Sequence, residues 1–176
     1  MKKIKIAVGL IAIIGLLFIS SHCKQKTSQI LELKKYPCNS LQGVITKNSI
    51  KVDEQISTDG QGSLLIISQQ PRTVRLFETG DIEAEDCRLL YQAKVRTENL
   101  KGRAYLEMWC HFPGKGEFYS RGLHNALSGS QDWTSTEAYF FLKKGENPDN
   151  VKLNLVIDGQ GKVWIDDIHL VKGPFE

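Results

Sequence analysis

Short apolar runs separated by turn-forming residues fill this sequence from Cys38 onward, and no stretch shows the period of an amphipathic helix. The first runs are "GSLLIIS", which follows "STDGQ", and "RTVRLFET", which follows Pro71. Three more, in "STEAYFFLKKGENPDNVKLNLVIDGQGKVWIDDIHLV", are separated by "KKGENPDN" and "GQG". At least seven strands at roughly ten-residue spacing predict an all-β fold. We expect a two-sheet antiparallel β-sandwich, because a closed barrel needs more regular strand lengths.

The segment "CRLLYQAKVRTENLKGRAYLEMWC" predicts a β-hairpin with one apolar face. Its apolar residues occupy odd positions in the first arm and even positions in the second: Leu89, Tyr91, Ala93 and Val95, then Leu106 and Met108. Cys87 and Cys110 share these parities, so both point into one layer. They either form a disulfide or remain two buried thiols. No Cys-x-x-Cys or Cys/His pair has the spacing of a zinc site.

The first 22 residues have the layout of a bacterial export signal, with a lysine-rich start, an apolar run from Ile6 to Ile19 and a polar end. The run is shorter than the roughly 20 residues that span a bilayer, which favours cleavage over an uncleaved anchor. Cys23 follows directly and resembles the lipidated cysteine of bacterial lipoproteins; ordinary cleavage without a lipid is the alternative. We therefore expect an exported protein of the bacterial cell envelope, held to the membrane by an N-terminal lipid. We expect three segments: an export signal at residues 1–22, a tether at 23–43 and the sandwich domain at 44–173.

The charge of the chain argues against a nucleic-acid partner. The formal net charge is +3, and Lys2, Lys3 and Lys5 are the only charged residues among the first 22. Subtracting these three charges from +3 leaves a net charge of zero for the remainder. A nucleic-acid ligand needs a basic surface, which this remainder does not supply.

The last apolar run contains two adjacent acids, Asp166 and Asp167, where its alternation changes phase. Val163 and Ile165 precede the acids on one parity, and Ile168 and Leu170 follow on the other. This change predicts a β-bulge or bend. An acid at such a point either accepts hydrogen bonds from backbone N–H groups that the bend leaves unpaired or helps to bind a cation.

Three stretches resemble the signatures of galactose-binding-like β-jelly rolls, the fold of many carbohydrate-binding modules of bacterial glycoside hydrolases. They are "TDGQGSLLI", "LLYQAKVRTENLKGRAYLEMW" and "DWTSTEAYFFLKKGENPDNVKLNLVIDGQGKVWIDDIHL". The resemblance covers about residues 44 to 172 and implies the same β-sandwich. It also implies that Asp166 or Asp167 helps to hold a structural calcium ion, whose preferred ligands are oxygen atoms.

Candidate binding residues lie on the polar parity of the predicted strands. Trp109 has Glu107 and His111 on the same parity, and the polar parities of neighbouring runs carry Gln92 and Asn154. An indole that stacks on sugar C–H groups, beside amides and acids that bond hydroxyls, forms a carbohydrate platform. The alternative is that the long segment 113–132 covers Trp109.

Catalytic motifs are missing from the sequence. It has no Ser-His-Asp order, no His-Glu-x-x-His motif and no phosphate-binding glycine loop. Glu107, Glu117 and His111 carry no pattern that marks an acid–base pair. We expect a non-catalytic module that binds carbohydrate or another cell-surface ligand. The alternative is a structural or protein-interaction domain of the cell envelope without a sugar ligand.

Overall fold

The computed structural model describes residues 29–80 and 82–175, which form eight antiparallel strands. They are β1 (Leu31–Tyr36), β2 (Ile50–Asp53), β3 (Ser63–Ser68), β4 (Arg72–Gly80), β5 (Cys87–Phe112), β6 (Gly116–Arg121), β7 (Leu127–Leu142) and β8 (Asn150–Gly173), with a 3-10 turn, η1 (Leu123–Asn125), before β7. The predicted all-β antiparallel fold is confirmed. No helix among these residues is long and apolar enough to cross a bilayer.

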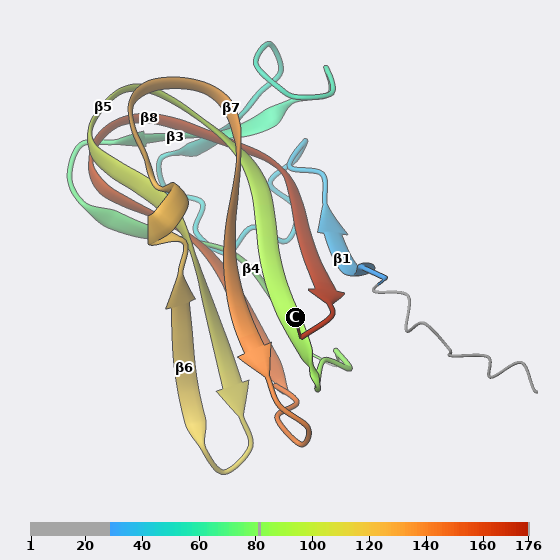
Figure 1. The fold of residues 1–176 in the computed structure, drawn as a ribbon. Coiled ribbons are helices and arrows are strands. Elements are labelled where there is room, and N and C mark those ends of the chain that lie inside the picture. Colours follow the sequence, from blue (N-terminus) through green and yellow to red (C-terminus); the bar gives the residue numbers. More distant parts are fainter. Residues whose placement is uncertain (1–28, 81, 176) are drawn as a thin grey trace, which may run out of the picture.

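Two long strands, β5 and β8, form the frame of the molecule. They pair along nearly their whole length, from Arg88 with Gly173 to His111 with Asn150. Midway both strands curve over, so that each contributes one half to each layer of the sandwich (Figure 1). Gly102 lies at the bend with a φ of +115°, and a Cβ atom there would lie 2.1 Å from the carbonyl oxygen of Asp158. Only glycine fits this close approach of the two backbones.

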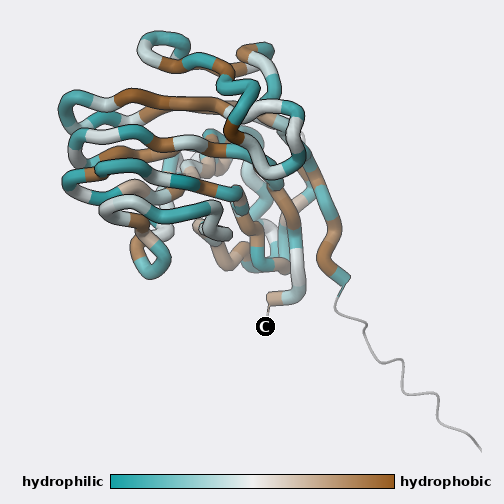
Figure 2. The backbone as a smooth tube through the Cα atoms, turned by 90° about the horizontal axis from the view of Figure 1, so that it is seen from above, coloured by the Kyte–Doolittle hydropathy of each residue, from teal (hydrophilic) through white to brown (hydrophobic). Residues whose placement is uncertain are grey.

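The remaining strands extend these halves into two layers. In the first layer, β7 pairs with the first half of β5, while β1 and β3 share the outer edge of the second half of β8, with β2 beyond β3. In the second layer, β6 pairs with the second half of β5, and β4 pairs with the first half of β8. The strands show the alternation of hydrophilic and hydrophobic residues that such layers require (Figure 2).

The core lies between the layers and uses the two parities expected from the sequence. Odd residues of the first half of β5, such as Leu89, and even residues of its second half, such as Leu106, both belong to it. The predicted hairpin is nevertheless wrong, because this segment is one continuous strand and each half pairs with β8. The alternation of apolar and polar residues looks the same in the arms of a hairpin and in one strand that passes through a bend, so the sequence does not distinguish them.

Of the two alternatives for Cys87 and Cys110, the structure shows two buried thiols rather than a disulfide, for the same reason. The two cysteines terminate opposite halves of β5, where Cys87 pairs with Leu142 on β7 and Cys110 with Val151 on β8. Both are free, buried thiols. Burial raises the pKa of the Cys110 thiol to about 12.

Part of the segment 23–43, expected to be a tether, belongs to the sheet. Strand β1 pairs with the end of β8, and the Tyr36 ring stacks on Phe77 with centroids 4.1 Å apart. Cys38 is buried directly after β1. The folded unit therefore includes residues from 31 onward rather than from 44. The expected export signal 1–22 and Cys23 lie outside the described residues.

Candidate functional site

The outer face of the second layer carries a groove of about 420 Å³. Four adjacent strands supply its lining: Thr73 and Arg75 from β4, Glu107 and Trp109 from β5, Glu117 and Arg121 from β6, and Lys152 and Asn154 from β8. The β5 residues point outward because their neighbours Leu106, Met108 and Cys110 point into the core.

Glu107 organises the floor of this groove, although only 3% of the residue is exposed. Its Oε1 accepts hydrogen bonds from Trp109 Nε1 at 2.7 Å and from Asn154 Nδ2 at 3.3 Å. Its Oε2 accepts one from Arg121 Nε at 2.7 Å. This bond and the negative charge of Glu107 raise the pKa of the Arg121 guanidinium above its usual value. A buried carboxylate thus fixes the positions of one indole, one amide and one guanidinium.

Aromatic side chains form the accessible surface above this floor. Trp109 is half-buried, and its cross-strand neighbour Tyr119 is 52% exposed, with ring centroids 4.9 Å apart. The guanidinium carbon of Arg121 lies 4.5 Å from the centroid of the Tyr119 ring, within cation–π distance. Lys152 pairs with Glu117 at the rim. The groove therefore places flat apolar surface beside charged hydrogen-bonding groups.

The segment 113–132, considered as a possible cover for Trp109, contains strand β6, the turn η1 and the start of β7. Strand β6 lies beside β5 and supplies Glu117 and Arg121, which line the groove, and Tyr119, which contacts the Trp109 ring; sequence reasoning missed all three as candidate binding residues. Their signal is the alternation in "GEFYSR", directly after the turn "PGKG". Trp109 is therefore flanked by this segment and keeps part of its surface accessible.

The structure brings together only some of the expected binding residues. Trp109, Glu107 and Asn154 meet in the groove. His111 lies further along β5 and does not line it; its Nδ1 contacts Asp149 Oδ1 at 2.5 Å. Gln92 lies in the first layer, where its Nε2 donates to Glu137 Oε2 at 3.1 Å. The expectation that Gln92 shares the face of Trp109 is wrong, because the bend in β5 carries the two residues into different layers.

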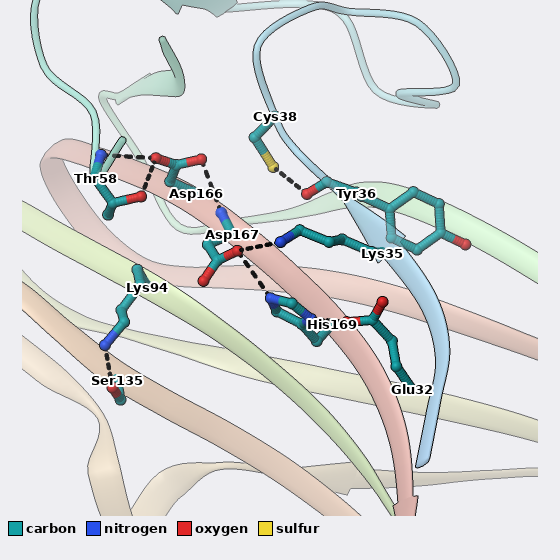
Figure 3. Close-up of polar contacts among 10 residues, drawn as sticks. All are labelled: Glu32, Lys35, Tyr36, Cys38, Thr58, Lys94, Ser135, Asp166, Asp167 and His169. Atoms are coloured by element: carbon teal, nitrogen blue, oxygen red, sulfur yellow. Dashed lines mark hydrogen bonds and ion pairs between the residues drawn. The ribbon is translucent and has the colours of Figure 1, made fainter. Parts of the chain in front are cut away.

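Asp166 secures the loop between β2 and β3 (Figure 3). Its Oδ2 accepts hydrogen bonds from the backbone N of Thr58 at 2.8 Å and from the Thr58 hydroxyl at 2.7 Å, and its Oδ1 accepts one from the Asp167 N at 2.8 Å. Asp167 has a φ of +48°, and the register between β5 and β8 shifts here, which confirms the expected bulge.

Asp167 contacts cationic and hydrogen-bonding partners. It binds His169 Nε2 at 2.8 Å and Lys35 Nζ at 3.4 Å, while His169 Nδ1 contacts Glu32 at 2.6 Å (Figure 3). Both aspartates thus face N–H, O–H or ammonium groups, which do not fit a bound calcium ion. Within residues 29–80 and 82–175, no cluster of three His, Cys, Asp or Glu side chains could hold a metal. The contacts favour the hydrogen-bonding role considered for these acids.

Solved structures with the same arrangement of strands include several carbohydrate-binding modules. One match is the structure of the CBM22-1 and GH10 modules of endo-1,4-β-D-xylanase 10B from Clostridium thermocellum, complexed with xylohexaose. Its TM-score is 0.60 and its sequence identity 11%. The match covers 81% of this chain and 28% of that one. The xylan-binding domain CBM22-1 of Paenibacillus barcinonensis Xyn10C matches with a TM-score of 0.58 and 14% identity, over 84% of this chain and 96% of that one. The chain thus shares the β-sandwich fold of these modules.

The same fold is also found outside these modules. A Stig cyclase from Fischerella matches with a TM-score of 0.51 and 13% identity, over 81% of this chain and 85% of that one. No protein-family model matches the sequence. No curated protein matches it either. The likeness thus concerns the fold, and the site itself has to supply the argument for function.

Proposed function

We propose that this protein is a non-catalytic carbohydrate-binding module, exported and attached to a bacterial membrane through a lipid on Cys23. The observation that carries the carbohydrate-binding part is the groove on the second layer, in which Glu107 holds Trp109 and Arg121 beside the exposed ring of Tyr119. The membrane part rests on the sequence of residues 1–23.

The chemistry of the groove suits a sugar. The faces of pyranose rings carry C–H groups that stack on indole and phenol rings, while their hydroxyls bond charged and amide side chains. Trp109 and the exposed Tyr119 ring beside it supply the stacking surface, and Arg75, Arg121 and Lys152 in the groove supply donors. Because similar folds have been solved with xylohexaose and as xylan-binding domains, a xylan-type oligosaccharide is the first ligand to test.

The state of the carboxylates supports binding rather than hydrolysis. Glycoside hydrolysis needs one carboxyl group as a proton donor and another as a base or nucleophile. Glu107 is buried and accepts hydrogen bonds from three side chains, and Glu117 pairs with Lys152. Both acidic side chains that line the groove are therefore engaged within the protein.

Isothermal titration of the mature protein with xylohexaose tests the carbohydrate-binding proposal. We expect saturable binding with one site per chain. Cello- and mannohexaose serve as comparisons of equal length, and any of the three that binds identifies the sugar class. Absence of binding to these and to a wider glycan panel would contradict the proposal and favour the structural or protein-interaction alternative.

A further inference from the structure

A contiguous apolar patch lies around the two ends of the described chain, away from the groove. It consists of Ile30, Leu31, Tyr139, Phe141 and Phe175, which are 65%, 53%, 37%, 49% and 38% exposed. These are half of the ten exposed large apolar side chains among residues 29–80 and 82–175. Single exposed apolar residues are ordinary on a protein surface, whereas a gathering of this kind marks an interaction surface.

The members of this patch contact one another or share one cavity. The ring centroids of Phe141 lie 5.4 Å from Tyr139 and 5.5 Å from Phe175. Phe175 in turn lines a cavity of about 500 Å³ together with Ile30 and Leu31. The surface is therefore continuous from β7, across the C-terminal residues, to the start of β1.

The position of the patch relative to Cys23 indicates what covers it. Ile30 lies seven positions after Cys23, and an extended chain spans at most about 3.5 Å per residue, so the two lie within about 25 Å of each other. The ends of the described chain are also neighbours, because Leu31 pairs with Lys172 (Figure 1). A lipid on Cys23 thus holds this surface next to the bilayer.

The groove and the patch lie on opposite sides of the sandwich. Tyr139 and Phe141 project from the outer face of the first layer, on the parity opposite to the core residues Ala138 and Leu142. The groove occupies the outer face of the second layer. A protein that rests on the membrane through the patch therefore directs its groove away from the bilayer.

We propose that the patch docks on the surface of the phospholipid bilayer and orients the groove outward. This inference rests on the proposed lipid anchor at Cys23. The charges beside the patch have both signs, with Glu85, Asp86 and Lys172 lining the same cavity. Burial of apolar side chains, rather than attraction to anionic lipids, provides the binding energy, so zwitterionic phosphatidylcholine is a sufficient surface.

Site-directed fluorescence in the full-length, processed protein tests this orientation. Phe141→Cys and Tyr119→Cys introduce a thiol at positions that are 49% and 52% exposed on the two opposite faces. Cys38, Cys87 and Cys110 are buried, so a thiol-reactive dye labels the introduced site. Each labelled protein is reconstituted in phosphatidylcholine vesicles with or without a spin-labelled phosphatidylcholine that quenches the dye on contact.

We expect several-fold stronger quenching at position 141 than at position 119, at low and at high salt. Equal quenching at both positions, or none at 141 in vesicle-bound protein, would overturn the docking inference while the anchor stands. Self-quenching at 141 that grows with protein density, without quenching by lipid, would overturn it in favour of a second copy of the chain. Mass spectrometry of the same sample shows whether Cys23 carries a lipid; an unmodified cysteine would overturn the anchor and the docking inference together.

Discussion

Arg121 and Glu107 face each other across β6 and β5, and their hydrogen bond of 2.7 Å joins a guanidinium at the surface to a buried carboxylate. The side chain of Glu107 is 5% exposed and that of Arg121 is 40% exposed. The pair fixes the charged part of the groove before any ligand arrives. A ligand bound in the proposed groove would then cost little side-chain entropy at this point, which favours affinity.

Removal of Arg121 should lower the free energy of unfolding more than removal of Arg75, the other arginine of the groove. Arg121→Ala leaves the Glu107 carboxylate buried without a cation, which should cost about 1–3 kcal/mol of the free energy of unfolding. Arg75 instead pairs with Glu78 at the surface, so Arg75→Ala should cost at most about 1 kcal/mol. Urea denaturation of the two variants at neutral pH makes the comparison. Equal losses of unfolding free energy in the two variants would show that Arg121 does not stabilise the buried Glu107 carboxylate.

The aromatic surface should carry much of the affinity for sugar. Aromatic stacking with nucleobases is worth about 1–3 kcal/mol, and a value near the lower end predicts roughly tenfold weaker binding for Trp109→Ala or Tyr119→Ala. Because Trp109 is half-buried, its removal should cost less stability than the roughly 3–5 kcal/mol of a fully buried tryptophan.

Phe118→Ala is the matched control for Tyr119→Ala, since Phe118 is 50% exposed on the same strand but has the opposite parity, and its ring contacts Phe112 whereas that of Tyr119 contacts Trp109. Its affinity in isothermal titration should equal that of the wild type. If Trp109→Ala unfolds the protein instead, or leaves the affinity unchanged, Trp109 is a structural residue and not part of a binding surface.

The three described cysteines should resist alkylation until the protein unfolds. Burial raises the pKa of Cys38, of Cys87 and, to about 12, of Cys110, so little of the reactive thiolate is present at neutral pH. We expect iodoacetamide to modify none of them in the native protein and all three in denaturant without a reductant. Mass spectrometry counts the modified sites, and protection of Cys87 and Cys110 in denaturant would reveal a disulfide between them.

Asp166 should stabilise the fold without a metal. Asp166→Ala removes a buried carboxylate that accepts hydrogen bonds from Thr58 and from the Asp167 N–H, and since hydrogen bonds to a charged group contribute about 1.5–3 kcal/mol, the variant should lose about that much stability. The melting temperature of the wild type should be the same in chelator and in millimolar calcium. A higher melting temperature in calcium would indicate that the native state binds the ion.

Membrane attachment should depend on Cys23. Stable anchoring of a protein takes more than one acyl chain, and a Cys23→Ala chain has no site for them. We expect the variant in the soluble exported fraction after cell fractionation, while the wild type sediments with membranes. A variant that stays membrane-bound and uncleaved would show that the apolar run from Ile6 to Ile19 acts as the anchor.

Local alternation predicts which residues enter the core, but it does not identify strand partners. The parities of Leu89 and Leu106 and the bulge at Asp167 could be read from the sequence because each depends on a few neighbouring residues. The pairing of Arg88 with Gly173 depends on a bend that joins distant segments. The path of β5 and the position of Gln92 therefore could not be predicted from the sequence. Strand β1 escaped notice because four of its six residues are exposed, which gives its sequence no apolar period.

Strand β8 is the last of the described strands, and it runs through both layers. Loop-closure entropy grows with the length of chain enclosed, so the pair His111 and Asn150 is the least costly contact with β5, and Arg88 with Gly173 the most costly. Pairing is therefore expected to start at His111 and Asn150 and to proceed through the bend. Neither layer can close until β8 is free to pair. The edges of β5 that await β8 stay open until then, which exposes the unfinished chain to aggregation.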